Sequence, residues 1–140
     1  MKYWDSSAML PLLISEKLSP EIKNRLRADP DMVAWWGTMA ECASALHRKE
    51  REGALSQPSL TQGMRRLKDL RSSWIEVEPG EKVREAALRL LRVHPLRAAD
   101  SLQLAAALIA NEQQTDAMEF VCLDERLRSA AEREGFSTIP

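Results

Sequence analysis

Short apolar runs alternate with longer helical patterns along the whole chain. The strand candidates are the apolar or aromatic runs at 2–4, 32–36, 74–77, 120–123 and 136–139. Between them, segments with helical spacing of apolar residues occupy 6–14, 20–28, 38–51, 60–73, 81–93, 97–111 and 125–134. Strands separated by helices pair in parallel through crossover connections. The pattern therefore predicts an α/β protein, with three α/β/α layers and a central parallel sheet of four to five strands.

Size and composition fit a single domain spanning residues 1–140. Hydrophobic residues make up 44% of the chain and charged residues 29%, which is typical of a globular protein with its own core. No segment approaches the roughly 18 apolar residues that a membrane span needs. The first residues do not resemble a signal peptide, because Asp5 interrupts them. Cys42 and Cys122 have neither disulfide nor zinc spacing, so we expect buried thiols in a cytoplasmic protein.

Four acidic residues each have a local structural explanation. Asp5 and Asp124 follow predicted strands and precede predicted helices, where an aspartate commonly caps the first turn. Glu41 stands three residues after Thr38, which is the spacing of a capping box. Asp100 could cap its helix in the same way. However, that helix is apolar nearly all round, and a buried carboxylate there needs a partner.

Considered together, these acids indicate a metal site. Asp5 and Asp124 should lie just beyond the carboxyl ends of strands, and Glu41 one turn beyond another. In open α/β sheets, this edge is where ligands bind. Carboxylates brought together there repel one another unless a cation neutralises them. Ligands that are all oxygen suit Mg²⁺ or Mn²⁺.

Four segments spread over the whole chain also carry recognisable motifs. They are YWDSSA at 3–8, ECASAL at 41–46, RAADSLQLA at 97–105, and DERL at 124–127 followed by Ala130, Ala131 and Gly135. With these motifs the sequence resembles the PIN domain family, and within it the VapC-type toxins of bacterial toxin–antitoxin pairs. The third motif is the most specific of the four.

The resemblance implies a function and a set of site residues. It implies that Asp5, Glu41, Asp100 and Asp124 are the catalytic acids, which bind Mg²⁺ or Mn²⁺ in an endoribonuclease. It also implies an RNA substrate, a homodimer and a small antitoxin protein as partners. Ser7 and Cys122 are expected to contact these acids and orient them, without binding the metal themselves. The family often has Thr or Ser at the position of Cys122, so the fine geometry of the site is expected to differ here.

The net charge of the chain is only −1, so the molecule as a whole does not attract RNA. RNA must instead be bound by a local group of basic residues. The four acids carry four negative charges, so the rest of the chain carries +3. Arg97 and Arg126 are the predicted RNA contacts. Further candidates are the basic residues of the helix at 60–73, although an ordinary solvated face explains them better: Arg65, Arg66, Lys68 and Arg71.

Two questions stay open at the level of sequence. Amphipathic segments at 22–26 and 60–70 could form an interface in a dimer, or they could pack into the core. A protein with this fold could also be a catalytically silent interaction module, although the presence of all four acids favours an enzyme. A phosphorylated receiver-like domain also places acids at strand ends, but it would need a lysine at a strand end, and no suitable one is present.

Overall fold

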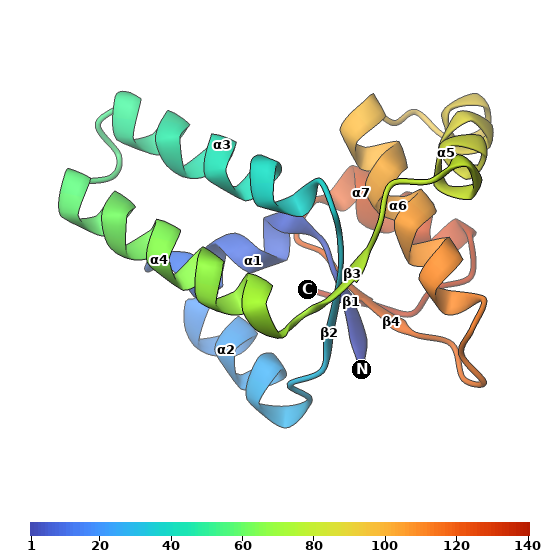
Figure 1. Ribbon diagram of the computed structural model, residues 1–140, viewed down its shortest axis with the longest axis horizontal. Coiled ribbons are helices and arrows are strands. Elements are labelled where there is room, and N and C mark those ends of the chain that lie inside the picture. Colours follow the sequence, from blue (N-terminus) through green and yellow to red (C-terminus); the bar gives the residue numbers. More distant parts are fainter.

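A computed structural model describes all residues from 1 to 140, and its centre is one parallel sheet of five strands. The strands are β1 (Lys2–Trp4), β2 (Met32–Trp35), β3 (Ile75–Val77), β4 (Glu119–Val121) and β5 (Thr138–Ile139). Every neighbouring pair is parallel, and the order across the sheet is β3-β2-β1-β4-β5 (Figure 1). The predicted α/β class and parallel sheet are confirmed.

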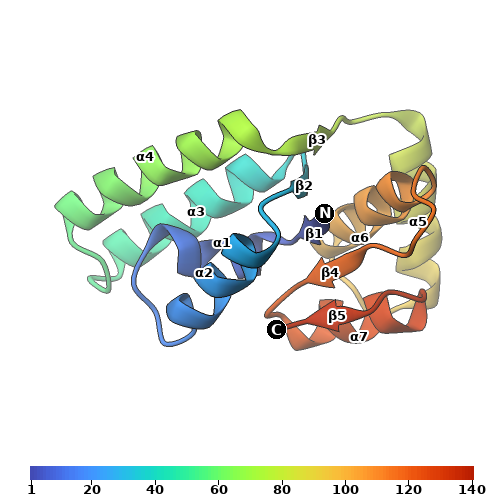
Figure 2. The same ribbon diagram turned by 90° about the horizontal axis from the view of Figure 1, so that it is seen from below.

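Seven helices cover the two faces of this sheet, which gives the three layers predicted from the sequence. Figures 1 and 2 show them in two groups, one on each side of the sheet. The first group is α1 (Ser6–Leu13), α2 (Ser19–Ala28), α3 (Thr38–Arg51) and α4 (Gln57–Ser73). The second group is α5 (Glu81–Val93), α6 (Ala98–Asn111) and α7 (Glu125–Arg133).

Alternating strand residues fill a separate core on each face of the sheet. Tyr3 of β1 and Phe120 of β4 stack with ring centroids 5.2 Å apart, in the core beneath α5, α6 and α7. Their neighbours Trp4 and Val121 point the other way, into the core beneath the first group of helices. All four side chains are completely buried. Because successive side chains of a strand point to opposite faces, β1 and β4 contribute to the cores under both helical layers.

The predicted boundaries differ from the observed ones mainly at helix starts and strand ends. Helix α4 begins at Gln57 rather than at 60, because the side chain of Ser56 caps it and a proline occupies its first turn. Strand β2 stops at Trp35, and the side chain of Trp36 beyond it is 54% exposed. Helix α1 includes Pro11 in its last turn and still ends only at Leu13.

The amphipathic segments at 22–26 and 60–70 pack into the core. Ile22 and Leu67 are completely buried, and both belong to the core beneath α1. Large exposed apolar side chains lie elsewhere, and three of them are on α5: Leu88, Leu91 and Val93. The core-packing alternative is therefore correct for the first two segments. No helix of the structure combines the length and the apolar character that a membrane crossing requires.

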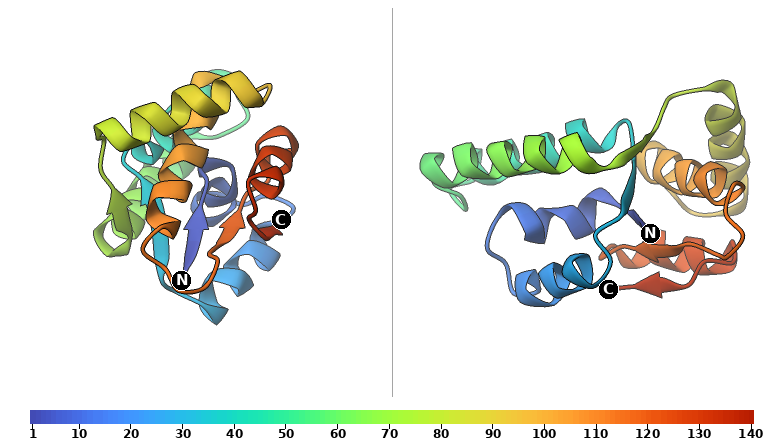
Figure 3. Two further views of the ribbon diagram at one scale, coloured as in Figure 1. Left: turned by 90° about the vertical axis from the view of Figure 1, so that its right-hand side faces the viewer. Right: turned by 60° about the horizontal axis from the view of Figure 1, so that its bottom comes forward.

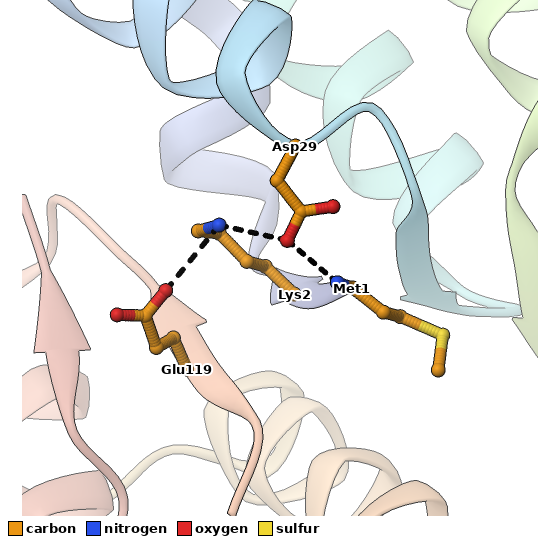
Figure 4. A network of polar contacts seen from close by, with 4 residues as sticks. All are labelled: Met1, Lys2, Asp29 and Glu119. Atoms are coloured by element: carbon orange, nitrogen blue, oxygen red, sulfur yellow. Dashed lines mark hydrogen bonds and ion pairs between the residues drawn. The ribbon is translucent and has the colours of Figure 1, made fainter.

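The amino-terminal edge of the sheet is held together by charges. Asp29 follows α2 and accepts hydrogen bonds from the amino group of Met1 and, at 2.8 Å, from Nζ of Lys2 (Figure 4). Lys2 also lies 3.3 Å from Glu119 of β4. The hydrogen bond from Lys2, with that from the chain terminus, lowers the pKa of Asp29 to about 2. This network joins the segment before β2 to β1 and β4, at the edge opposite the acids considered next.

Candidate metal centre

The order of the strands reverses between β1 and β4, and a cleft opens beyond their carboxyl ends. Reversal points of this kind are where open parallel sheets bind their ligands. The cleft has a volume of about 470 Å³. Its lining comes from α1, α3 and the starts of α6 and α7, which the left view of Figure 3 shows converging at one end of the sheet. The lining residues are Asp5, Ser6, Ser7, Leu10, Ala40, Glu41, Ser44, Ala45, Arg48, Asp100 and Asp124.

Asp5 lies at the bottom of this cleft, directly after β1, with only 3% of its surface exposed. Its carboxylate caps α1 by accepting the backbone N–H of Ser7 at 3.0 Å, and it also accepts the hydroxyl of Ser7. The thiol of Cys122 donates to it at 3.6 Å. Burial raises the pKa of Asp5, and the charge of Asp100 adds to this, against the hydrogen bonds from Ser7 and Cys122.

Ser7 links the two strands at the reversal point. Its hydroxyl donates to Asp5 after β1 and accepts the backbone N–H of Leu123 after β4 at 2.9 Å. Its oxygen also lies 3.7 Å from the sulfur of Cys122. A single hydroxyl therefore fixes the position of Asp5 relative to the segment that leads to Asp124.

Glu41 enters the cleft from the first turn of α3. It accepts the amide of Gln103 at 2.7 Å and the hydroxyl of Ser6 at 3.4 Å. The capping-box alternative is wrong, since α3 has Gly37 at its N-cap and no side-chain cap. Burial, followed by the negative charges of Asp5 and Asp100, raises the pKa of Glu41 to about 7. The hydrogen bond from Gln103 acts in the opposite direction.

Asp100 and Asp124 come from the starts of α6 and α7. Asp100 is half-buried, and its pKa is raised by burial and then by the charge of Asp124. Asp124 is exposed and caps α7 by accepting the N–H of Leu127 at 2.9 Å. The capping explanation is thus correct for Asp5 and Asp124, yet both also line the cleft. A cap and a ligand can be the same side chain.

The chemistry of these donors fits a hard divalent cation. All four are carboxylates, and the charge of one acid raises the pKa of another: Asp100 acts on Asp5, both Asp5 and Asp100 act on Glu41, and Asp124 acts on Asp100. That mutual repulsion is what a bound cation would relieve. In this structure, however, no three His, Cys, Asp or Glu side chains converge closely enough to form a ready-made set of ligands. The acids share one cleft without closing around a single point.

One basic residue of the cleft was missed in the sequence. Arg48 lies on the face of α3 that also carries Glu41 and Ser44, at helical spacings of three and seven residues. Its guanidinium forms no ion pair within the protein. The i, i+3, i+7 spacing from Glu41 could have identified it. Arg97 and Arg126 lie close enough to Asp100 for their charges to lower its pKa.

The basic residues of α4 lie away from the acids. None of them lines the cleft. Arg71 pairs with Glu76 at 3.0 Å and lies over the ring of Trp74, and Arg66 donates to the carbonyl of Leu13. Arg65 and Lys68 are exposed on the same helix. The solvated-face alternative is therefore the better description of this group.

Comparison with known proteins identifies the fold. No protein-family model matches the sequence, and no curated protein matches it. Solved structures do match in three dimensions. PAE2754 from Pyrobaculum aerophilum is 18% identical, with a TM-score of 0.70 over 99% of this chain and 89% of that one. At this identity the likeness establishes the fold alone.

Two further structures of the same fold have names that state a role. VapC20 from Mycobacterium tuberculosis, described as a toxin that cleaves the sarcin-ricin loop, is 15% identical with a TM-score of 0.68, over 97% of this chain and 96% of that one. A toxin–antitoxin complex from Klebsiella pneumoniae is 16% identical with a TM-score of 0.62, over 89% and 87%. The predicted PIN-like fold, which this chain shares with these structures, is therefore confirmed.

Proposed function

We propose that this chain is a metal-dependent endoribonuclease, the VapC-type toxin of a toxin–antitoxin pair. The observation that supports this most strongly is the meeting of four carboxylates in one cleft. Asp5, Glu41, Asp100 and Asp124 come from four separate segments and share the cleft beside the reversal point of the sheet. The raised pKa values of Asp5, Glu41 and Asp100 mark a group of acids that is poorly stable without a counter-charge.

In this proposal the four acids hold one or more Mg²⁺ or Mn²⁺ ions. A bound ion of this kind activates water and neutralises charge on the phosphate during an in-line displacement. Ser7 and Cys122 act on the acids rather than on RNA, because Ser7 of α1 and Cys122 after β4 both donate to Asp5. No nucleophilic side chain is required. His47 is exposed on α3, and His94 is buried beside Glu134 at 3.1 Å, so neither serves the cleft.

Three arginines supply the contacts to the phosphate backbone. Arg97 and Arg126 flank Asp100, and Arg48 lies in the cleft itself. Seven residues separate Arg48 from Glu41, which places their backbones roughly 10 Å apart along the helix. Arg48 therefore contacts a phosphate next to the scissile one, whereas the acids and their metal act on the scissile phosphate. A guanidinium binds a phosphate through paired N–H donors.

The proposed function also implies two protein partners, an antitoxin and a second copy of this chain. The neighbour from Klebsiella pneumoniae is a toxin–antitoxin complex, and we propose that a small antitoxin protein binds this chain as well. We also propose a homodimer, for which exposed Leu88 and Leu91 on α5 offer an apolar surface. Light scattering tests the dimer. Two free buried cysteines agree with a cytoplasmic location.

The experiment that tests the activity is cleavage of RNA by the purified chain. Total RNA and structured ribosomal RNA fragments are incubated with the protein in Mg²⁺ or Mn²⁺, and in EDTA. The proposal predicts discrete cleavage products with metal and none with EDTA. Products of equal yield in EDTA would rule out the metal, and intact RNA in every reaction would favour a silent interaction module.

A further inference from the structure

Gln103 is a completely buried polar residue next to the acids, and the proposed catalytic set does not include it. It is completely buried on α6, one helical turn after Asp100, and is followed by the apolar residues Leu104 to Ala107. An amide placed in such a core is costly unless its groups are hydrogen-bonded. All of its partners are therefore informative about its role.

The hydrogen bonds of Gln103 run through three elements. Its Nε2 donates to Glu41 at 2.7 Å and to the hydroxyl of Thr38 at 3.0 Å, both on α3. Its Oε1 accepts the hydroxyl of Tyr3, from β1, at 2.7 Å. Both N–H groups and the carbonyl are thus used, and the chain Tyr3–Gln103–Glu41 connects β1, α6 and α3.

Only one orientation of the amide satisfies this network. Glu41 must be ionised to bind a cation, and an ionised carboxylate has no proton to donate, so in that state Nε2 faces Glu41 and Oε1 faces Tyr3. Tyr3 is completely buried, and its hydroxyl oxygen lies 2.7 Å from Oε1 of Gln103. A phenol is protonated at neutral pH, so this hydroxyl donates to Oε1. Tyr3 fixes the amide, and the amide fixes Oε2 of Glu41.

We propose that Gln103 is a positioning residue that holds the carboxylate of Glu41 in the orientation required to bind the divalent cation, with Tyr3 keeping the amide in register. This inference rests on the proposed function. A neutral donor suits the task. It donates to one carboxylate oxygen of Glu41, Oε2, without adding a positive charge that would compete with the cation. The other carboxylate oxygen of Glu41, Oε1, is contacted only by Ser6, at 3.4 Å, and stays available to the cleft.

The experiment measures Mn²⁺ binding by isothermal titration, with melting temperatures as the test of folding. Gln103→Met keeps the length of the side chain and removes the amide. Tyr3→Phe removes a single oxygen and keeps the stacking on Phe120. Partners that orient metal-binding carboxylates typically account for 10- to 100-fold in affinity. We expect Gln103→Met to weaken Mn²⁺ binding by about 10-fold or more, and Tyr3→Phe to weaken it less.

Two comparisons separate positioning from a general structural role. Ser101→Ala is the matched control, because Ser101 is equally buried on α6 but bonds only to the carbonyl of Ala98. It should leave Mn²⁺ affinity unchanged. In a Glu41→Gln background, adding Gln103→Met should weaken the remaining binding no further, since its effect passes through Glu41.

The possible outcomes distinguish this inference from the proposed function. If the unaltered chain binds Mn²⁺ but Gln103→Met and Tyr3→Phe bind it equally well, the positioning role is wrong while the metal site stands. An equal loss of affinity with and without Glu41 would also overturn the positioning role. If the unaltered chain binds no Mn²⁺, both the metal site and this inference are wrong.

Discussion

The sulfur of Cys122 lies 3.6 Å from Oδ2 of Asp5, although 117 positions separate the two residues in the sequence. Burial and the neighbouring charge of Asp5 raise the pKa of the Cys122 thiol, so it remains protonated and donates a weak hydrogen bond. The contact joins the end of β4 to the acid that follows β1. A thiol thus occupies a position where a hydroxyl would donate more strongly.

Replacing Cys122 tests what that donor contributes. Cys122→Ala should lower the free energy of unfolding by about 1 kcal/mol and weaken Mn²⁺ binding a few-fold, because Asp5 loses a donor. Cys122→Ser should restore or exceed the affinity of the unaltered chain. Thermal melts and Mn²⁺ titrations measure both quantities. A serine variant that binds Mn²⁺ more weakly than the alanine variant would show that the donor plays no part in the site.

The stability of the metal-free protein should depend on pH through Glu41. Its pKa is raised from 4.5 to about 7, so the folded state holds the proton more tightly than the unfolded chain. Stability from this group is complete below pH 4.5 and is lost as the pH rises towards about 7. The loss is at most about 3 kcal/mol. Melts in EDTA across this range should show the decline, and Glu41→Gln should make it shallower.

Asp29 provides an internal contrast in the same measurement. Its pKa is lowered to about 2, so its contribution is present above pH 3.8 and is lost as the pH falls towards 2. The two effects occupy separate pH windows and have opposite signs. A stability that rises steadily from pH 4.5 to 7 would contradict the raised pKa of Glu41.

Divalent metal should stabilise the folded chain. The cation relieves the repulsion among Asp5, Glu41 and Asp100, which the unfolded chain does not impose. At a Mn²⁺ concentration of ~100 times the Kd, the gain is ~2.7 kcal/mol, equivalent to a rise of several degrees in Tm. The rise should be larger at pH 8 than at pH 5, where protons compete for the acids. Mn²⁺ that leaves Tm unchanged at pH 8 would contradict a metal site.

Arg48 should act on RNA binding rather than on the chemical step. Arg48→Ala should raise KM for an oligoribonucleotide by about 10-fold with little change in kcat, since a flanking phosphate is bound equally in the ground state and in the transition state. The penalty should shrink for a dinucleotide, which has only the scissile phosphate. Arg51→Ala is the matched control, because Arg51 is exposed on the same helix but outside the cleft. Equal KM values for the two variants would remove Arg48 from the binding surface.

Much of the fold was predictable because each element carries its own signals. The bounds of α3 and α5 were predicted to the residue, since glycine and proline mark their ends. The parallel sheet followed from the alternation of elements. Strand ends were less predictable: the N–H of Trp36 bonds to Val77 of β3, but the residue lies outside β2 and its large side chain is exposed.

The acids of the cleft were predictable as well, because Asp5 and Asp124 follow apolar strands. The parts that depend on three-dimensional pairing were not. Gln103 was visible only as a polar residue in an apolar helix, and its partners Tyr3 and Glu41 lie 100 and 62 positions away. Arg71 had the charge expected of an RNA contact, but tertiary structure pairs it with Glu76 instead.

The most direct test of the central claim is the Asp100→Asn substitution, assayed by RNA cleavage in Mn²⁺ and by thermal melts in EDTA. Asparagine keeps the shape and much of the hydrogen-bonding capacity of the side chain, but it removes the charge. If Asp100 binds the metal, cleavage should fall by orders of magnitude, while Tm in EDTA should rise because a repelled charge is gone. Cleavage at the rate of the unaltered chain, with an unchanged Tm, would remove Asp100 from the site and contradict the proposed metal centre.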